Sequence, residues 1–189
     1  MGVISPTDTV LDQPWTTDTF LAWEDRQEGK YEFDGRNAVP MTGGSLAHQD
    51  IVFNLRGLLS RLLADRPFRT VQEMRVRIGT RIRYPDVLVC AGPLDQTTRT
   101  LTDAIAIFEV LPDDTATTGR VNKLIDYAAV PSLRSYVMLE QTAAAVTLFQ
   151  REPGGAWTAS AQTGGALFLS GIDLTLPLAD LYQGLTFAA

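Results

Sequence analysis

The chain has 189 residues, of which 45% are apolar, and carries 16 basic against 22 acidic side chains for a formal net charge of −6. This length and composition suit an ordinary soluble globular domain. A single cysteine and a single histidine exclude a Cys/His zinc cluster and a disulfide framework. The sequence pI of about 4.7 argues against a surface coated in positive charge for nucleic acid.

No targeting or membrane segment is expected. Residues 1–15 lack the basic and apolar regions of a signal peptide, and no apolar run approaches the ~18 residues that a membrane span needs. We therefore expect a cytoplasmic protein without a membrane anchor. Because residues 1–15 also show no periodic pattern, we expect an irregular segment there and a single domain over residues 16–189.

The first expected elements are two helices with a short hairpin between them. One helix is expected to begin at Thr17 as its cap and to end at Gly29. Short strands are expected at 31–33 and 38–41. Apolar residues at helical spacing predict a longer helix from about Ser45 to Asp65.

Strands dominate the rest of the chain. Residues 70–78 and 81–90 predict a hairpin through Gly79-Thr80. Strand 104–111 is apolar on both faces, which is typical of a strand in the middle of a sheet that helices cover. The further expected strands are 135–139, 146–150, 157–161 and 166–169. The order predicts an α/β (α+β) fold with a mixed central β-sheet flanked by helices and an antiparallel hairpin extension at the C-terminus.

A third helix is expected from about Ala116 to Ala129. The apolar residues expected to form its buried stripe are Val121, Leu124, Ile125 and Ala128. Arg120, Lys123 and Tyr127 form a polar strip beside that stripe. Lys123 could bend back over the strand ends, although a solvated surface position is the commoner fate of a lysine.

Two acidic residues occupy positions where apolar ones are expected. Glu109 shares a face of its strand with Ile107 and Leu111, and an ionised carboxylate is costly to bury unless it is paired, hydrogen-bonded or metal-bound. Asp86 follows Pro85 inside a strand, where a proline implies a bulge that can re-aim a side chain. The structural alternative for Glu109 is a buried ion pair with an arginine. For Asp86 it is an aspartate that caps a turn at the start of a strand. Two carboxylates on adjacent strands would suit Mg²⁺ or Mn²⁺.

Several motifs together resemble one family. They are Arg-Tyr-Pro-Asp-Val-Leu-Val (83–89), Phe-Glu-Val-Leu (108–111), Arg120-x-x-Lys123, Pro-Ser-Leu-Arg-Ser-Tyr (131–136), Tyr31-Glu32 with Asp34-Gly35, and Ala47-His48-Gln49. In order and spacing they resemble the Uma2 family (DUF820) of the PD-(D/E)xK, restriction-endonuclease-like superfamily. The resemblance extends from about Phe20 to Leu181.

The resemblance implies a metal-dependent nuclease of restriction-endonuclease-like fold. Asp86 and Glu109 would hold the divalent metal, Mg²⁺ or Mn²⁺. The lysine usual at position 111 is replaced by Leu111, and Lys123 would supply it. Glu32 would be an accessory acid. The residues that would face the substrate are His48, Gln49 and Arg120.

The sequence departs from the family pattern in the loop after Glu109. Pro112-Asp113-Asp114-Thr115 stands where Ser-Pro-Ser-Thr is usual, Gly119 replaces an acid and Arg36 replaces a glutamate. The two additional acids could add metal ligands or repel a phosphate.

Alternatives remain for several residues. The arginines of the 70–90 hairpin (Arg75, Arg77, Arg81 and Arg83) could bind phosphate or form a solvated face. His48 could be a hydrogen-bonded core residue instead of a site residue, whereas Cys90 is expected to be a buried structural thiol.

Three functions are compatible with the sequence. The first is hydrolysis of phosphodiester bonds in nucleic acid, DNA more readily than RNA. The second is an inactive nuclease-fold interaction module that acts as a homodimer, with the apolar C-terminal hairpins as core or interface. The third is metal-dependent hydrolysis of a small phosphorylated substrate.

Overall fold

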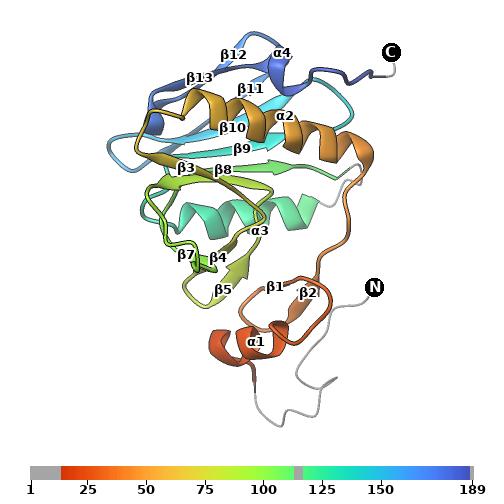
Figure 1. Cartoon of the computed structure of the whole chain (residues 1–189), viewed down its shortest axis with the longest axis vertical. Coiled ribbons are helices and arrows are strands. Elements are labelled where there is room, and N and C mark those ends of the chain that lie inside the picture. Colours follow the sequence, from red (N-terminus) through yellow and green to blue (C-terminus); the bar gives the residue numbers. More distant parts are fainter. Residues whose placement is uncertain (1–13, 113–116, 188–189) are drawn as a thin grey trace.

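A six-stranded sheet forms the body of the molecule, with strand order β11-β10-β9-β8-β6-β3 (Figure 1). The computed structural model describes residues 14–112 and 117–187, without the side chains of 117–120. The strands are β3 (Phe68–Gln72), β6 (Val87–Ala91), β8 (Ala104–Val110), β9 (Ser135–Leu139), β10 (Val146–Arg151) and β11 (Trp157–Gln162). Within this six-stranded sheet, the β8–β9 pair is parallel and the other described pairs are antiparallel. The predicted mixed sheet, with 104–111 among its central strands, is therefore confirmed.

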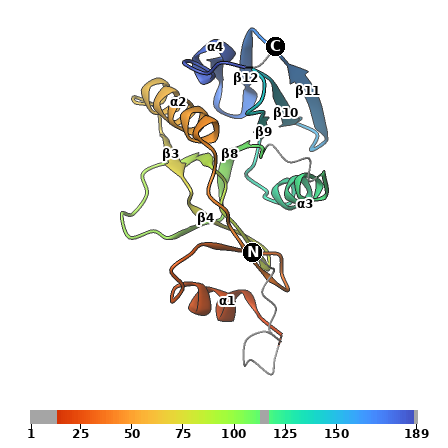
Figure 2. The same ribbon diagram turned by 90° about the vertical axis from the view of Figure 1, so that its right-hand side faces the viewer.

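Helices cover both faces of this sheet. The long helix α2 (Leu46–Leu62) lies on one face and α3 (Thr117–Ala128) on the other (Figure 2). The face under α2 is completed by the hairpin of β12 (Ala166–Leu169) and β13 (Leu174–Pro177), with a short η1 turn between them and α4 (Leu178–Leu181) after them. In the described part of the chain, none of the helices is both long and apolar enough to cross a membrane.

A second sheet has the order β2-β1-β5-β4-β7. Its strands are β1 (Tyr31–Phe33), β2 (Ala38–Pro40), β4 (Arg75–Ile78), β5 (Arg81–Arg83) and β7 (Thr100–Leu101). The predicted strands 70–78 and 81–90 are thus each divided between the two sheets. The first breaks at Glu73, which has a positive φ of 48°, and the second breaks at Pro85-Asp86, where proline cannot donate to the ladder.

The N-terminal helix α1 (Thr17–Glu24) packs on the second sheet through aromatic side chains. Phe20 is fully buried and stacks on Phe33 with ring centroids 4.8 Å apart. The helix cap is Thr16, one residue before the expected Thr17, because Thr16 and Thr19 form a reciprocal capping box. Trp15 is buried in the same cluster, so the packed structure begins before residue 16. The rest of the predicted irregular segment, residues 1–13, lies outside the described residues.

The expected inner face of α3 is only partly correct: Leu124 packs against the core, but two of the four expected residues are exposed. Val121 and Ile125 are 49% and 58% exposed, whereas Asp126 and Tyr127 are buried. The helix therefore turns part of its polar strip toward the sheet. This orientation is possible because Asp126 and Tyr127 each have a hydrogen-bond partner on a strand.

Candidate functional site

The break after β5 places Asp86 at the point where the two sheets part. The Asp86 carboxylate accepts a hydrogen bond from the Val110 backbone N–H, with 2.7 Å between Oδ2 and N. The Asp86 carbonyl accepts another from Glu73 N–H at 3.1 Å. The Val110 contact lies at the end of β8 and the Glu73 contact lies after β3, so Asp86 is held from both sides and its side chain is fixed next to the strand that carries Glu109.

Glu109 is buried and faces α3. Its Oε1 accepts a hydrogen bond of 2.6 Å from the Tyr127 hydroxyl, and its Oε2 accepts one of 2.9 Å from Lys123 Nζ. Lys123 and Tyr127 are four residues apart and so lie on one side of the helix. The structure agrees with the expectation that Lys123 bends back over the strand. It does not agree with the alternative that Lys123 is a solvated surface lysine.

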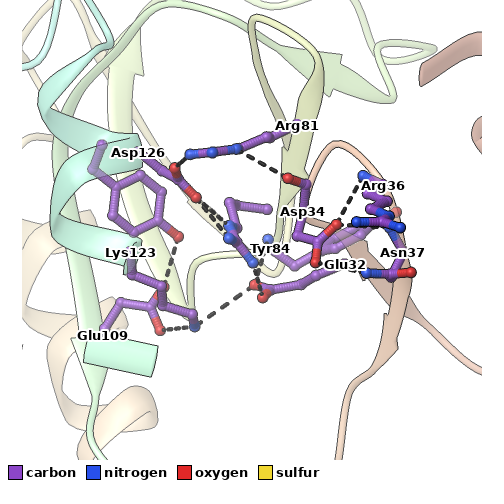
Figure 3. Close-up of polar contacts among 11 residues, drawn as sticks. Glu32, Asp34, Arg36, Asn37, Arg81, Tyr84, Glu109, Lys123 and Asp126 are labelled. Carbon is purple, nitrogen blue, oxygen red and sulfur yellow. Dashed lines mark hydrogen bonds and ion pairs between the residues drawn. The ribbon is translucent and has the colours of Figure 1, made fainter. Parts of the chain in front are cut away.

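Lys123 lies between two acids from different sheets (Figure 3). Besides Glu109 it contacts Glu32 of β1, with 3.6 Å between Nζ and Oε1. Glu32 is held in turn by Arg83, whose Nη1 donates to Oε2 at 2.8 Å. The side chains of Glu32 and Arg83 are both less than a tenth exposed. The second sheet thus contributes directly to the surroundings of Lys123.

Asp126 links the second sheet to α3. Its Oδ2 accepts hydrogen bonds from Arg83 Nε at 2.9 Å and from Nη2 at 2.6 Å, and its Oδ1 contacts Arg81 Nη1. The Asp126 side chain is fully buried. Because Asp126 and Lys123 are three residues apart, this ion pair fixes the same helical turn that presents Lys123.

His48 enters the site from the start of α2. Its Nε2 lies 3.3 Å from Asp86 Oδ1. A Cβ on Gly44 would lie only 2.6 Å from the His48 ring, so the ring rests against backbone that only glycine can provide. The predicted cap Ser45 is confirmed, since its hydroxyl accepts from His48 N–H at 3.1 Å.

A cavity of about 830 Å³ lies between the start of α2, the end of β8 and the second sheet. Its lining includes the six predicted site residues whose side chains are described: Glu32, His48, Gln49, Asp86, Glu109 and Lys123. Arg120 lies in the first turn of α3, but its side chain is outside the described part, as is the loop 113–115 with its two extra acids.

The electrostatics of the cavity are set by burial and by crowded acids. Burial raises the pKa of the Glu109 carboxyl to about 7; Lys123 opposes this shift, and Asp86 and Glu32 add to it. Burial acts to lower the pKa of Lys123, but the charges of Glu109 and Glu32 outweigh it and raise that pKa. Lys123 is therefore an ammonium group at neutral pH.

Two further groups have defined protonation preferences. The hydrogen bond to Asp86 raises the pKa of His48 above its usual value, against the effect of burial. Burial raises the pKa of the Tyr127 hydroxyl well above its usual value, and the Glu109 charge adds to the shift. The Tyr127 hydroxyl therefore stays protonated and donates a hydrogen bond to Glu109.

The four arginines of the 70–90 hairpin each have an acidic partner in the structure. Arg75 pairs with Glu24 and Asp25, Arg77 contacts Asp18, and both Arg81 and Arg83 pair with Asp126. The hairpin arginines therefore all pair with the protein's own carboxylates. The side chains of Arg77 and Arg81 are still 41% and 43% exposed, in partial agreement with the expected solvated face, whereas those of Arg75 and Arg83 are largely buried.

The donor set of the cavity fits a hard divalent cation completed by other ligands. The carboxylates of Asp86 and Glu109 supply oxygen donors, which Mg²⁺ and Mn²⁺ prefer. Among the described residues, no group of three or more His, Cys, Asp and Glu side chains is arranged to hold an ion. Water and substrate oxygens would therefore have to complete a coordination shell that begins with these two acids.

Sequence reasoning missed the part played by Asp126. Its only sequence signal is an acid three residues after Lys123 in an amphipathic helix, and its arginine partners lie more than 40 positions away in β5. Tyr127 was identified as part of a polar strip but not as a donor to Glu109. Both roles depend on how α3 sits on the sheets.

The mixed sheet, the helices on both its faces and the acidic cavity beside its central strand define an α+β protein of nuclease-like fold. The sequence model of the Uma2 family, described as "putative restriction endonuclease", matches residues 17–179, and the chain belongs to that family.

Two uncharacterized proteins of Synechocystis sp. are each 29% identical to this chain. One matches over 173 residues, 89% of this chain and 91% of the relative, and the other over 148 residues, 75% and 84%. The fold is similar to the crystal structure of a DUF820 protein from Anabaena variabilis that is described as a putative nuclease. That similarity has a TM-score of 0.72 at 18% identity and covers 89% of this chain and 98% of the other.

Proposed function

We propose that this protein is a divalent-metal-dependent nuclease that hydrolyses phosphodiester bonds, with DNA as the preferred substrate. The observation that carries the proposal is that Glu32, Asp86, Glu109 and Lys123 come from four separate elements or turns and line one cavity. Structural ion pairs need no cavity, whereas a reaction needs a space in which substrate meets these groups.

Asp86 and Glu109 are proposed to hold Mg²⁺ or Mn²⁺. A bound ion would generate a nucleophilic hydroxide from water and offset the charge of the scissile phosphate. Support comes from the charge balance, because four acids line the cavity (Glu32, Glu73, Asp86 and Glu109) and the Lys123 ammonium lies between two of them. Burial is the main cause of the raised pKa of the Glu109 carboxyl, Asp86 and Glu32 add to it and Lys123 opposes it, so a bound cation would favour the ionised carboxylate.

Lys123 is proposed to stabilise negative charge that develops on the phosphoryl oxygens, or to orient the attacking water. Its ammonium form suits an electrostatic role and not that of a general base. Glu32 positions this ammonium from the side opposite Glu109. His48 and Gln49, at the start of α2, are placed to contact the substrate on the other side of the cavity.

The acidic cavity also bears on the order of binding. A phosphate entering it alone would meet Glu32, Asp86 and Glu109, so nucleic acid should bind there only when a cation is present. We expect chelation of divalent ions to abolish binding at the cavity as well as cleavage.

A cleavage assay tests the proposal. Single- and double-stranded DNA and RNA are incubated with the protein and Mg²⁺ or Mn²⁺, and Glu109→Gln is compared with Glu28→Gln, a matched change at an exposed acid outside this cavity. We expect metal-dependent cleavage that falls roughly a hundredfold or more in Glu109→Gln only. Cleavage that survives Glu109→Gln unchanged would refute the site, and no cleavage of any polymer would favour the interaction module.

A further inference from the structure

Strand β11 ends the six-stranded sheet and has a partner on one side only. It pairs with β10 along its whole length, from Trp157 opposite Arg151 to Gln162 opposite Val146. Figure 2 shows β11 at the outer side of the sheet, with α2 and β3 toward the opposite side. Side chains 158–161 are exposed, so both faces of the strand are open as well as its edge.

The register shows which backbone groups of β11 point outward. Glu152 N–H donates to Ala156 O in the turn, while Arg151 N–H donates away from β11 to Arg134 O. Hydrogen-bonded positions alternate along an antiparallel pair, so residues 158, 160 and 162 face β10. The N–H and C=O groups of Trp157, Ala159 and Ala161 therefore face outward, and none of them has a partner among the described residues.

This edge lacks the features by which proteins prevent strand pairing. Charges, prolines and bulges normally protect an exposed edge. The opposite edge strand β3 carries Arg69, and β2 at the edge of the second sheet ends in Pro40. By contrast, no residue from 153 to 172 is charged, although 20% of the chain is charged overall, and β11 itself has neither proline nor bulge.

We propose that β11 is the contact through which two copies of this chain pair, edge to edge and antiparallel, about a two-fold axis at Ala159. In this register the outward-facing groups of Trp157 in one copy meet those of Ala161 in the other, and Ala159 meets Ala159. The two six-stranded sheets then become one continuous sheet.

The side chains favour a second copy over an unrelated strand. A two-fold contact must be self-complementary, and the register places the large Trp157 opposite the small Ala161 and Thr158 opposite Ser160. No like charges face each other across this contact, because the strand and both of its turns from residue 153 onward are uncharged. The pairing uses no residue of the cavity and is independent of the proposed nuclease activity.

The test exploits the alanine at the centre of the contact. Sedimentation equilibrium of the full chain across the micromolar range should show a concentration-dependent mass rising from 20.7 kDa toward twice that value. Ala159→Glu and Ala159→Lys each place like charges opposite one another and should weaken the dimer about two- to fivefold. An equal mixture of the two variants should restore it, because opposite charges then meet.

Ala64→Glu, the same change at an exposed alanine after α2, is the matched control and should leave the mass unchanged. Circular dichroism establishes that each variant is folded, which the exposure of the Ala159 side chain favours. A wild type that stays at 20.7 kDa throughout overturns the proposal. So does a dimer that both Ala159 variants leave intact, since the contact would then lie elsewhere.

Discussion

The ion pair between Asp126 and Arg83 predicts a large loss of stability when its acid is neutralised. In Asp126→Asn the amide keeps the volume of the side chain but not its charge, and Arg83 stays in a site where its side chain is only 8% exposed. Removing one partner of a buried pair costs about 3–5 kcal/mol. Arg83 keeps Glu32 as a second partner, so we expect the lower end, about 3 kcal/mol.

Urea unfolding measures this change directly, with the free energy of unfolding extrapolated to water and an unchanged m-value. In a domain of this size, a loss of about 3 kcal/mol also lowers Tm by about 6–12 °C. The control is Asp180→Asn, whose exposed contact with Arg61 is 4.0 Å long and should contribute less than about 1 kcal/mol. If Asp126→Asn remained within about 1 kcal/mol of wild type, the pair would not stabilise α3 and the reasoning would fail.

Three further predictions concern the environment of Glu109. Tyr127→Phe removes the buried hydroxyl that donates to Glu109 and should cost about 1–3 kcal/mol of unfolding free energy; a neutral change in urea unfolding would contradict this. Lys123→Met removes the ammonium from between its two acids. It should reduce cleavage roughly a hundredfold or more while Mn²⁺ still binds, and loss of both would contradict separate roles. Because burial raises the pKa of Glu109 from 4.5 to about 7, folding takes up a proton between these values. The stability that the protonated Glu109 carboxyl contributes is complete below about pH 4.5 and is lost as pH rises through about 7. Unfolding curves of metal-free wild type should therefore lose stability from pH 5 to pH 8 relative to Glu109→Gln, and parallel curves would count against the shift.

The sequence was most informative where a residue contradicts its local pattern. Pro85 inside an apolar strand predicted a break, and the chain does pass there from one sheet to the other. Glu109 inside a strand that is apolar on both faces predicted a buried carboxylate, and Glu109 is buried. In both cases the local pattern is strong enough that a single exception has few physical explanations.

The orientation of α3 could not be predicted in the same way. Apolar spacing predicted an inner face of Val121, Leu124, Ile125 and Ala128. Leu124 does pack on the core, but Val121 and Ile125 are exposed and the helix buries Asp126 and Tyr127. A buried acid is stable only with its partner, and the partner Arg83 is 43 positions away. Helical periodicity carries no information about such a distant contact. For the same reason the sequence did not reveal that the hairpin arginines pair with carboxylates of distant segments.

The central claim is that Asp86 and Glu109 form a divalent-metal site, and a calorimetric titration with Mn²⁺ tests it most directly because it requires no knowledge of the substrate. The account predicts saturable binding of Mn²⁺ to the wild type that is lost in Asp86→Asn and retained in Asp180→Asn, a matched change at an acid outside the cavity. Wild type that does not bind Mn²⁺, or Asp86→Asn that binds it as tightly as wild type, would contradict the account.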